Sequence, residues 1–385
     1  MRYRKKGMAI ALLLTATLAG CNMGASSSNQ KGEKAFQKEQ YSEAIEYFNQ
    51  AISQDNTKEE YFINQGMTYI KLGQLEKAVE SFQVALEKDG ANMLALRGLG
   101  IAYLKMGQYE DAIAAFDNAI ANTGTRVDEL DYDILQYKGE AQYGMSDYDG
   151  AIITYGKLID LGIDTIENYI RRGILYGYQK QYDSAISDFE SAINEDKSNH
   201  ETYIQVYNEL TKLGKEDIAN EYLKKALNIE GNSDNDHLMR GKIYYMLNDM
   251  ENAKTEIQSA SNSGNKEAKY YLARIYEEME DYNSAMSLYQ EELANGTDEP
   301  AIIYNQIAIC KMKQEDYSGA LSMIEQGLKE ASITLEQTKK LKWNEAMVYE
   351  QMGDYQTAYN KIKEYGDTYS YTEEVEKELA FLKTR

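Results

Sequence analysis

The 385-residue chain has very little cysteine, histidine or proline, with two, two and one of these residues respectively. Cys21 and Cys310 are too few for a disulfide framework, so the folded state must be stabilised by packing. With one proline, glycine and Asn or Asp turns must end the helices. His200 and His237 lie in no recognisable catalytic or metal-binding motif. Because enzymes usually need a poised acid, base, nucleophile or metal, we predict no enzymatic activity, no cofactor and no metal site.

Three segments resemble reactive or metal-binding sites only superficially. His237 follows two aspartates in SDNDHL, but Asp and Asn before a helix usually act as caps. The acidic segment DELDYD, residues 128–133, lacks the glycine and the final glutamate of a calcium loop, and is interpreted as solvated charge. Cys310 lies in YNQIAICKM, where an apolar helix favours burial over a redox role.

Long hydrophobic runs are absent, apart from the twelve residues Met8 to Ala19. A membrane-spanning helix needs about 20 apolar residues, so this run is too short to be one. Four basic residues precede it, and it ends with Leu18-Ala19, which Gly20 and Cys21 follow directly. A basic segment, a short apolar segment and a small-residue cleavage site are typical of a secretory signal. We therefore predict that residues 1–20 are a signal peptide.

The sequence Leu-Ala-Gly-Cys ending at Cys21 resembles the lipobox of bacterial lipoproteins. The resemblance implies that Cys21 is acylated and becomes the mature N-terminus; an ordinary secretory signal with an incidental cysteine is the alternative. Two or three acyl chains anchor a protein stably, whereas one does so only marginally. Residues 21–30, which include the polar stretch from Asn22, are predicted to be a flexible tether. The expected location is the extracytoplasmic face of the cell membrane.

Positive charge is scarce, with 41 Lys and Arg against 63 Asp and Glu. Removal of residues 1–20 would leave 37 positive residues and increase the imbalance. Such an acidic body repels nucleic acid and anionic lipid headgroups. We therefore predict no nucleic acid partner, whereas basic protein partners are compatible with the charge.

Three adjacent segments repeat with a period of 34 residues. They are GEKAFQKEQYSEAIEYFNQAI from Gly32, GMTYIKLGQLEKAVESFQVAL from Gly66 and GIAYLKMGQYEDAIAAFDNAI from Gly100. Each has an alanine twelve residues after the glycine, and a phenylalanine four residues later. The pattern resembles the tetratricopeptide repeat, a helical hairpin of 34 residues. We expect each repeat glycine to face the repeat alanine, because small residues let helix axes approach to about 8 to 10 Å.

The same register continues along the chain and predicts ten copies. The repeat alanine recurs at Ala151, Ala185, Ala219, Ala253, Ala285, Ala320 and Ala358. The resemblance implies an all-α solenoid that forms a right-handed superhelix over residues 31–369. Residues 370–385 carry Val375, Leu379, Phe381 and Leu382 among charges, which predicts a C-terminal capping helix. Tyrosines that recur with the repeat are better explained by packing than by binding.

In this family the first helix of each hairpin lines a concave face, where partners bind. The resemblance places these positions at Ile63, Met67, Ile70, Arg97, Ile101, Leu104, Glu140, Tyr143, Ile170 and Ile174. They would form an apolar stripe, and exposed apolar patches commonly mark interaction sites. The alternative is that tight curvature buries these residues against one another. No repeat carries the Lys and Asn pair with which some members bind a terminal carboxylate.

These observations predict a lipid-anchored scaffold that binds other envelope proteins or peptide segments in its groove. One alternative is an assembly factor for a surface polymer or a secretion complex. The other is a solute-binding protein or an enzyme, which the absence of catalytic constellations disfavours.

Overall fold

The computed structural model describes residues 23–122, 129–262 and 264–385, and all regular secondary structure in these ranges is α-helical. The predicted signal peptide, residues 1–20, and Cys21 lie outside the described residues. No helix within the described ranges is both long and apolar enough to cross a membrane.

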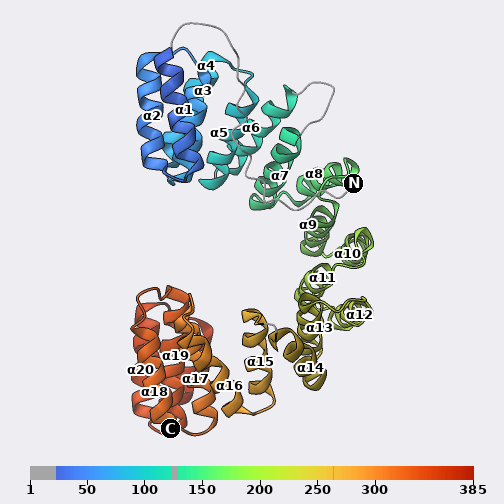
Figure 1. Cartoon of the computed structure of the whole chain (residues 1–385), viewed down its shortest axis with the longest axis vertical. Helices are drawn as coiled ribbons and strands as arrows, with labels where there is room; N and C mark the ends of the chain where they lie inside the picture. Colours follow the sequence, from blue (N-terminus) through green and yellow to red (C-terminus); the bar gives the residue numbers. More distant parts are fainter. Residues whose placement is uncertain (1–22, 123–128, 263) are drawn as a thin grey trace. The chain divides into compact units, whose positions relative to one another are not determined.

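The described residues form ten consecutive helical hairpins and one further helix (Figure 1). The predicted all-α repeat architecture is therefore confirmed. The chain divides after Lys197 into two units, which are described separately. In each hairpin, the helix that comes first in the chain is called the first helix and the other the second helix.

Unit 1 contains five hairpins. They are α1 (Met23–Gln37) with α2 (Tyr41–Gln54), α3 (Glu59–Lys71) with α4 (Leu75–Lys88), α5 (Met93–Lys105) with α6 (Tyr109–Ala121), α7 (Glu129–Gly144) with α8 (Tyr148–Asp160), and α9 (Thr165–Tyr178) with α10 (Tyr182–Glu195).

Unit 2 contains five hairpins and the last helix. They are α11 (His200–Lys212) with α12 (Glu216–Ala226), α13 (Asp234–Met246) with α14 (Met250–Asn262), α15 (Lys266–Glu278) with α16 (Tyr282–Ala294), α17 (Pro300–Lys313) with α18 (Tyr317–Leu328), and α19 (Leu335–Gln351) with α20 (Tyr355–Thr368), followed by α21 (Glu373–Leu382).

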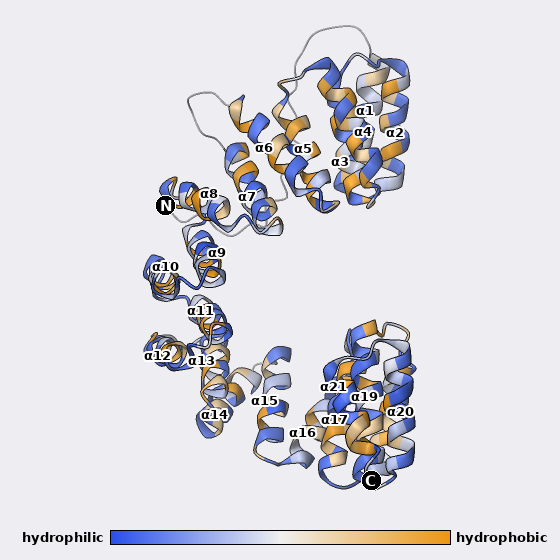
Figure 2. Cartoon of the chain, turned by 180° about the vertical axis from the view of Figure 1, so that it is seen from behind, coloured by the Kyte–Doolittle hydropathy of each residue, from blue (hydrophilic) through white to orange (hydrophobic). Residues whose placement is uncertain are grey.

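The repeated small and large residues are explained by packing within each hairpin. The repeat alanines and the second-helix phenylalanines Phe48, Phe82, Phe116 and Phe189 are fully buried. A Cβ atom added to Gly66 would lie 2.8 Å from the ring of Phe82. In the first five hairpins the repeat glycine thus faces an aromatic ring of the second helix, and in the seventh Gly241 faces Ile257. The repeat alanine, which was expected from the sequence to face the glycine, is not its main contact. Many helices, such as α2 and α4, consequently present one hydrophobic and one hydrophilic side (Figure 2), whereas α17 has buried residues all round it.

Every hairpin turn contains one residue with a left-handed backbone conformation. Four of these residues are glycines, including Gly73 with φ 71°. The other six are Glu39, Ser146, Lys180, Asn248, Glu280 and Glu315, with φ between 60° and 63°. In the second hairpin, for example, the N–H of Gln74 donates to the carbonyl of Tyr69 at 2.9 Å across the turn. Such bonds satisfy the last carbonyls of the first helix and reverse the chain.

The first hairpin begins earlier than the sequence predicts. Residues 21–30 were expected to form a flexible tether, but α1 starts at Met23 and its residue Ala25 is fully buried. Ala25 packs with Ala51 of α2 and Tyr61 of α3. Asn29 is also buried, because its side chain forms hydrogen bonds within a polar network described below. The structure therefore differs from the predicted tether over residues 23–30.

The last helix, α21, lies in the segment for which a capping helix was predicted. Val375 and Leu382 are buried and pack in one cluster with Ala358 and Ile362 of α20. Phe381 is exposed, and the Arg385 guanidinium lies 5.0 Å from the centre of its ring. The remaining surface of α21 is charged, which suits the end of a stack of repeats.

Candidate functional site

Half of the ten predicted groove residues are buried. They are Ile63, Ile70, Arg97, Ile101 and Ile170, each with at most 9% of its surface exposed. Ile63, Ile70 and Ile101 belong to one hydrophobic cluster together with residues of α4, α5 and α6. These side chains are therefore buried among residues of both first and second helices, and they are not exposed as the predicted groove requires.

Arg97 is occupied by contacts within unit 1. Its guanidinium forms an ion pair with Asp133 of α7 and lies 5.6 Å from the centre of the Tyr137 ring. Asp131 and Asp133 are both buried, so this part of the acidic segment 128–133 is not the solvated surface predicted from the sequence. Residue 128 of that segment lies outside the described residues. Arg97 thus links two repeats and is not available to a partner.

Tyr143 is the most exposed of the ten predicted residues, with 44% of its surface accessible. Its hydroxyl lies 3.1 Å from that of Tyr178, and the Tyr148 and Tyr178 rings stack with centroids 5.4 Å apart. The Glu140 carboxylate lies 3.7 Å from the Arg171 guanidinium. Burial raises the pKa of the Glu140 carboxyl group. Met67, Leu104, Glu140 and Ile174 are half-buried. Five of the ten predicted residues therefore stay at least partly accessible, and three of them, Met67, Leu104 and Ile174, are apolar.

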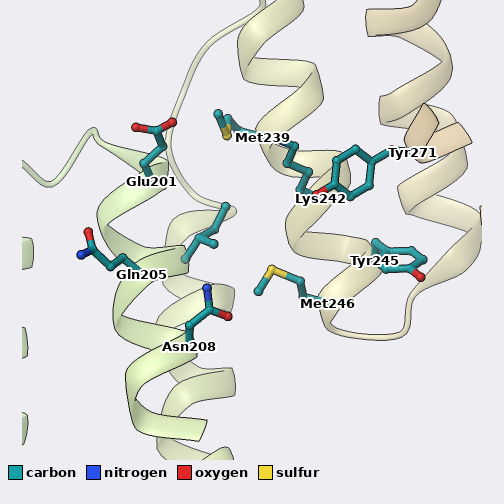
Figure 3. Close-up of a pocket in the computed structure, with 9 residues that line it drawn as sticks. Glu201, Gln205, Asn208, Met239, Lys242, Tyr245, Met246 and Tyr271 are labelled. Carbon is teal, nitrogen blue, oxygen red and sulfur yellow. The ribbon is translucent and has the colours of Figure 1, made fainter. Parts of the chain in front are cut away.

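A cavity that the sequence analysis did not identify opens to solvent in unit 2. It has a volume of about 450 Å³ and lies between the first helices α11, α13 and α15 (Figure 3). Its lining consists of Glu201, Ile204, Gln205, Asn208, Met239, Lys242, Tyr245, Met246 and Tyr271. Asn208 of α11 and Met246 of α13 extend toward one another, and Tyr271 reaches in from α15 (Figure 3).

The repeat register contained a signal for this cavity. Lys242 and Tyr245 stand one and four residues after Gly241, as Glu140 and Tyr143 stand after Gly139. The predicted set stopped at the fifth repeat, whereas the cavity lies in the sixth to eighth. Applying the same positions to these repeats names Lys242 and Tyr245, and also Ile204 and Asn208, which stand three residues before and one after Tyr207. It would not have shown that the side chains leave a space between them.

Of the two charged residues that line the cavity, Lys242 has an ion-pair partner and Glu201 has none among the described residues. The Lys242 ammonium forms an ion pair with Glu267 and lies 5.1 Å from the centre of the Tyr271 ring. Glu201 is exposed at the first turn of α11 and has no ion-pair partner among the described residues. The cavity therefore carries one neutralised cation and one uncompensated anion.

The amide groups of Gln205 and Asn208 are also available at the cavity. Neither side chain has a hydrogen-bond partner within the described parts of the chain, and both are at least partly accessible. An amide side chain both donates and accepts hydrogen bonds. Beside the apolar surfaces of Ile204 and Met246, these groups can recognise a ligand that is itself both polar and apolar.

The two histidines take part in local contacts of unit 2. His237 Nδ1 lies 2.7 Å from a carboxylate oxygen of Glu256, which also pairs with Arg240. The neighbouring Asp236 forms a capping box with Ser233, as the interpretation of SDNDHL as a helix start predicts. His200 is buried, and burial lowers its pKa. Within the described residues, no group of three or more His, Cys, Asp or Glu side chains is arranged to hold a metal ion.

Two buried polar networks lie away from the cavity. In unit 1, the Glu33 carboxylate accepts hydrogen bonds from Asn29 at 2.9 Å and Asn64 at 3.3 Å, and Glu60 accepts one from Asn29 at 3.2 Å. Burial and the nearby Glu60 charge raise the pKa of Glu33, and burial raises the pKa of Glu60. These carboxyl groups have amide partners and no cation within hydrogen-bond distance among the described residues.

In unit 2, the Cys310 thiol donates to Glu277 at 3.6 Å and is fully buried, as its apolar segment predicts. Burial and the neighbouring Glu277 carboxylate raise the pKa of the Cys310 thiol to about 12. A thiol with this pKa is protonated at neutral pH and is a poor nucleophile.

Comparison with known proteins agrees with this architecture. The tetratricopeptide repeat family matches residues 29–93, 63–124, 97–164, 166–199 and 271–301, which together cover more than half of the chain. The small glutamine-rich tetratricopeptide repeat-containing protein 2 of Saccharomyces cerevisiae is 30% identical over 128 residues. That match covers 33% of this chain and 35% of the yeast protein, so the chain spans about a third of its relative.

Solved structures with some similarity include a tetratricopeptide repeat protein from Parabacteroides merdae, which is 18% identical with a TM-score of 0.46. That match covers 63% of this chain and 94% of the other. Yeast Tom70 is 16% identical with a TM-score of 0.39, over 94% of this chain and 95% of Tom70. The family matches and the ten observed hairpins together show that the chain belongs to the tetratricopeptide repeat proteins.

Proposed function

We propose that this chain is a non-enzymatic scaffold that binds segments of partner proteins on the first helices of its repeats, with the unit 2 cavity as a principal site. The observation that carries this proposal is the set of available groups at the cavity, namely two amides and one carboxylate beside apolar side chains. Three consecutive first helices contribute to it, so an extended segment can contact several repeats at once.

The buried state of Ile63, Ile70, Ile101 and Ile170 supports a site in unit 2 over the stripe expected in unit 1. Residues that already pack in the core of a repeat stack contribute to stability and cannot contact a partner. At the cavity, by contrast, Asn208 and Glu201 are exposed and Ile204 and Met246 are partly accessible.

A test of this function compares partner capture by the full chain with capture by two variants. Asn208→Arg places a bulky cation in the cavity, whereas Asn228→Arg makes the same substitution at an exposed position after α12. Each chain is crosslinked in the cells that express it and is then purified with the proteins bound to it. A partner protein should be captured by the natural chain and by Asn228→Arg, and should not be captured by Asn208→Arg. Equal capture by all three chains would place binding elsewhere on the molecule.

The proposed scaffold is held by lipid on the extracytoplasmic face of the cell membrane, and its partners are other envelope proteins. The basic segment, the short apolar run and Leu-Ala-Gly-Cys ending at Cys21 support this location. Only Asn22 separates Cys21 from the helical residue Met23. A lipid on Cys21 would therefore be attached two residues before the first hairpin.

The anchor is tested by following the chain after cell fractionation. The natural chain should sediment with membranes and should yield an acylated N-terminal peptide that begins at Cys21. Cys21→Ser should release the chain from membranes and abolish the acylated peptide. A Cys21→Ser chain that stays in the membrane fraction to the same extent would contradict lipid anchoring.

A further inference from the structure

We propose that the unit 2 cavity selects an extended peptide segment in which an apolar side chain stands next to a lysine or an arginine. This inference rests on the proposed function and adds the chemistry of the occupant. It depends on three properties of the cavity: its apolar surface, its uncompensated negative charge and its available amides.

The apolar part of the cavity is formed mainly by thioether and aliphatic side chains. Met246 of α13 and Ile204 of α11, which are partly accessible, line it together with the ring of Tyr271, and Met239 borders it with only 8% of its surface exposed. Methionine side chains are flexible and polarizable, so they adapt to apolar groups of different shapes. This surface favours an occupant with one aliphatic or aromatic side chain, without fixing which one.

The charge of the cavity determines the second feature of the occupant. Lys242 is neutralised by Glu267, and its own side chain is only 14% exposed. Arg274, on the helix that carries Tyr271, pairs with Glu277 at 3.4 Å and with Glu278 at 4.0 Å. Glu201 remains without a cationic partner among the described residues. An anionic occupant, including a free terminal carboxylate, would meet net negative charge, whereas a lysine or arginine would compensate Glu201.

The amides favour a peptide as the occupant. An extended peptide segment presents backbone N–H and C=O groups that lack partners. Gln205 and Asn208 lie on α11 at positions three residues apart, where they face the same side of the helix. Each can donate to a backbone carbonyl and accept from a backbone N–H, which a purely apolar small molecule could not use.

The test uses the full chain with isotope-labelled methionine methyl groups and three synthetic probes. The probes are the blocked peptides acetyl-Gly-Leu-Lys-Leu-Gly-amide and its Gln and Glu counterparts at the central position, which differ in one charge. Nuclear magnetic resonance follows the methyl signals of Met239 and Met246 during titration. At low salt the lysine peptide should bind about five to ten times more tightly than the glutamate peptide.

Two charge-changing variants make the test specific. Glu201→Lys should reverse the order of the Lys and Glu peptides. Glu251→Lys changes the net charge equally at an exposed position on α14, and should leave the order unchanged. Circular dichroism and thermal melting verify that both variants remain folded. A reversal in Glu201→Lys alone would support the local role of Glu201.

The outcomes separate this inference from the function on which it rests. If all three peptides shift the Met239 and Met246 signals with equal affinity, the cavity binds peptide but the selectivity for a basic residue is refuted. If none of the peptides shifts these signals while other methionine signals respond, both the selectivity and the cavity as a binding site are refuted.

Discussion

The left-handed turn residues lead to a prediction in which two similar substitutions have opposite effects. Gly73 has a φ of 71°, and a Cβ atom added there would meet no atom within 4 Å. Gly73→Ala therefore introduces no clash, and only the backbone conformation opposes it. Placing a residue with a Cβ in this conformation costs about 1 to 2 kcal/mol. The smaller entropy of the unfolded alanine chain offsets about 0.4 to 1 kcal/mol of this cost.

The net expectation is that Gly73→Ala lowers the free energy of unfolding by about 0.5 to 1 kcal/mol. Gly90 provides the matched control, because it has no left-handed φ and a Cβ added there would lie 3.6 Å from the nearest atom, the carbonyl oxygen of Leu86. Gly90→Ala should therefore leave stability unchanged or raise it by about 0.4 to 1 kcal/mol. Glu280 has a φ of 60°, so that its Cβ already opposes the backbone conformation. Glu280→Gly removes this strain and should stabilise unit 2 by about 0.5 kcal/mol.

The assay is urea unfolding followed by circular dichroism, combined with hydrogen exchange of the affected hairpin, because units of a repeat stack can unfold separately. The urea concentration at the unfolding midpoint should be lower for Gly73→Ala than for the natural chain, and should not be lower for Gly90→Ala. The dependence of the unfolding free energy on urea concentration should be similar in all three chains. A stabilised Gly73→Ala, or an equal loss in both alanine variants, would refute the assignment of strain to the turn conformation.

Three further predictions concern buried groups. Arg97→Ala should destabilise unit 1 by about 3 to 5 kcal/mol in urea unfolding, because Asp133 is left buried without its cation. The double variant Arg97→Met with Asp133→Leu should lose much less stability. Equal losses of stability in the two variants would contradict a buried ion pair. Ile101→Asp and Ile170→Asp should each lower stability by more than about 3 kcal/mol, because both side chains are buried, and a change below about 0.5 kcal/mol would mean that they are exposed. The pKa of Glu33 is raised by burial above that of the unfolded chain, so the folded state binds more protons and stability should fall as the pH rises from about 4.5 through the folded pKa. Glu33→Gln should reduce this pH dependence in thermal melting and raise stability at pH 7, and an unchanged pH profile would contradict the account.

The hairpins could be predicted from the sequence because the residues that recur in each repeat pack against each other within the same hairpin. In the first three repeats the glycine of the first helix and the phenylalanine of the second recur every 34 residues, since each pair must fit within its own hairpin. The last helix, α21, could be predicted in the same way, because the apolar residues Val375 and Leu382, which are buried, stand among charged neighbours in the sequence. These features depend on residues close together in the sequence.

The exposure of the first-helix residues could not be predicted in the same way. It depends on how closely consecutive first helices approach, and therefore on the sizes of side chains in two repeats together. Arg97 illustrates this, because its burial requires Asp133 of the next repeat. Residues 23–30 illustrate another case, since their small polar residues are typical of a linker, yet Asn29 is held by partners on α1 and α3.

The central claim is that partners bind at the unit 2 cavity, and site-specific photo-crosslinking in living cells tests it most directly. A photoreactive amino acid is placed at position 208, in the cavity, or at position 224, on the exposed surface of α12 where the Lys224 side chain is 60% accessible. The account predicts that one protein partner is crosslinked from position 208 and not from position 224, and that Glu201→Lys weakens this crosslink. A partner crosslinked equally from both positions, or from position 224 alone, would contradict it.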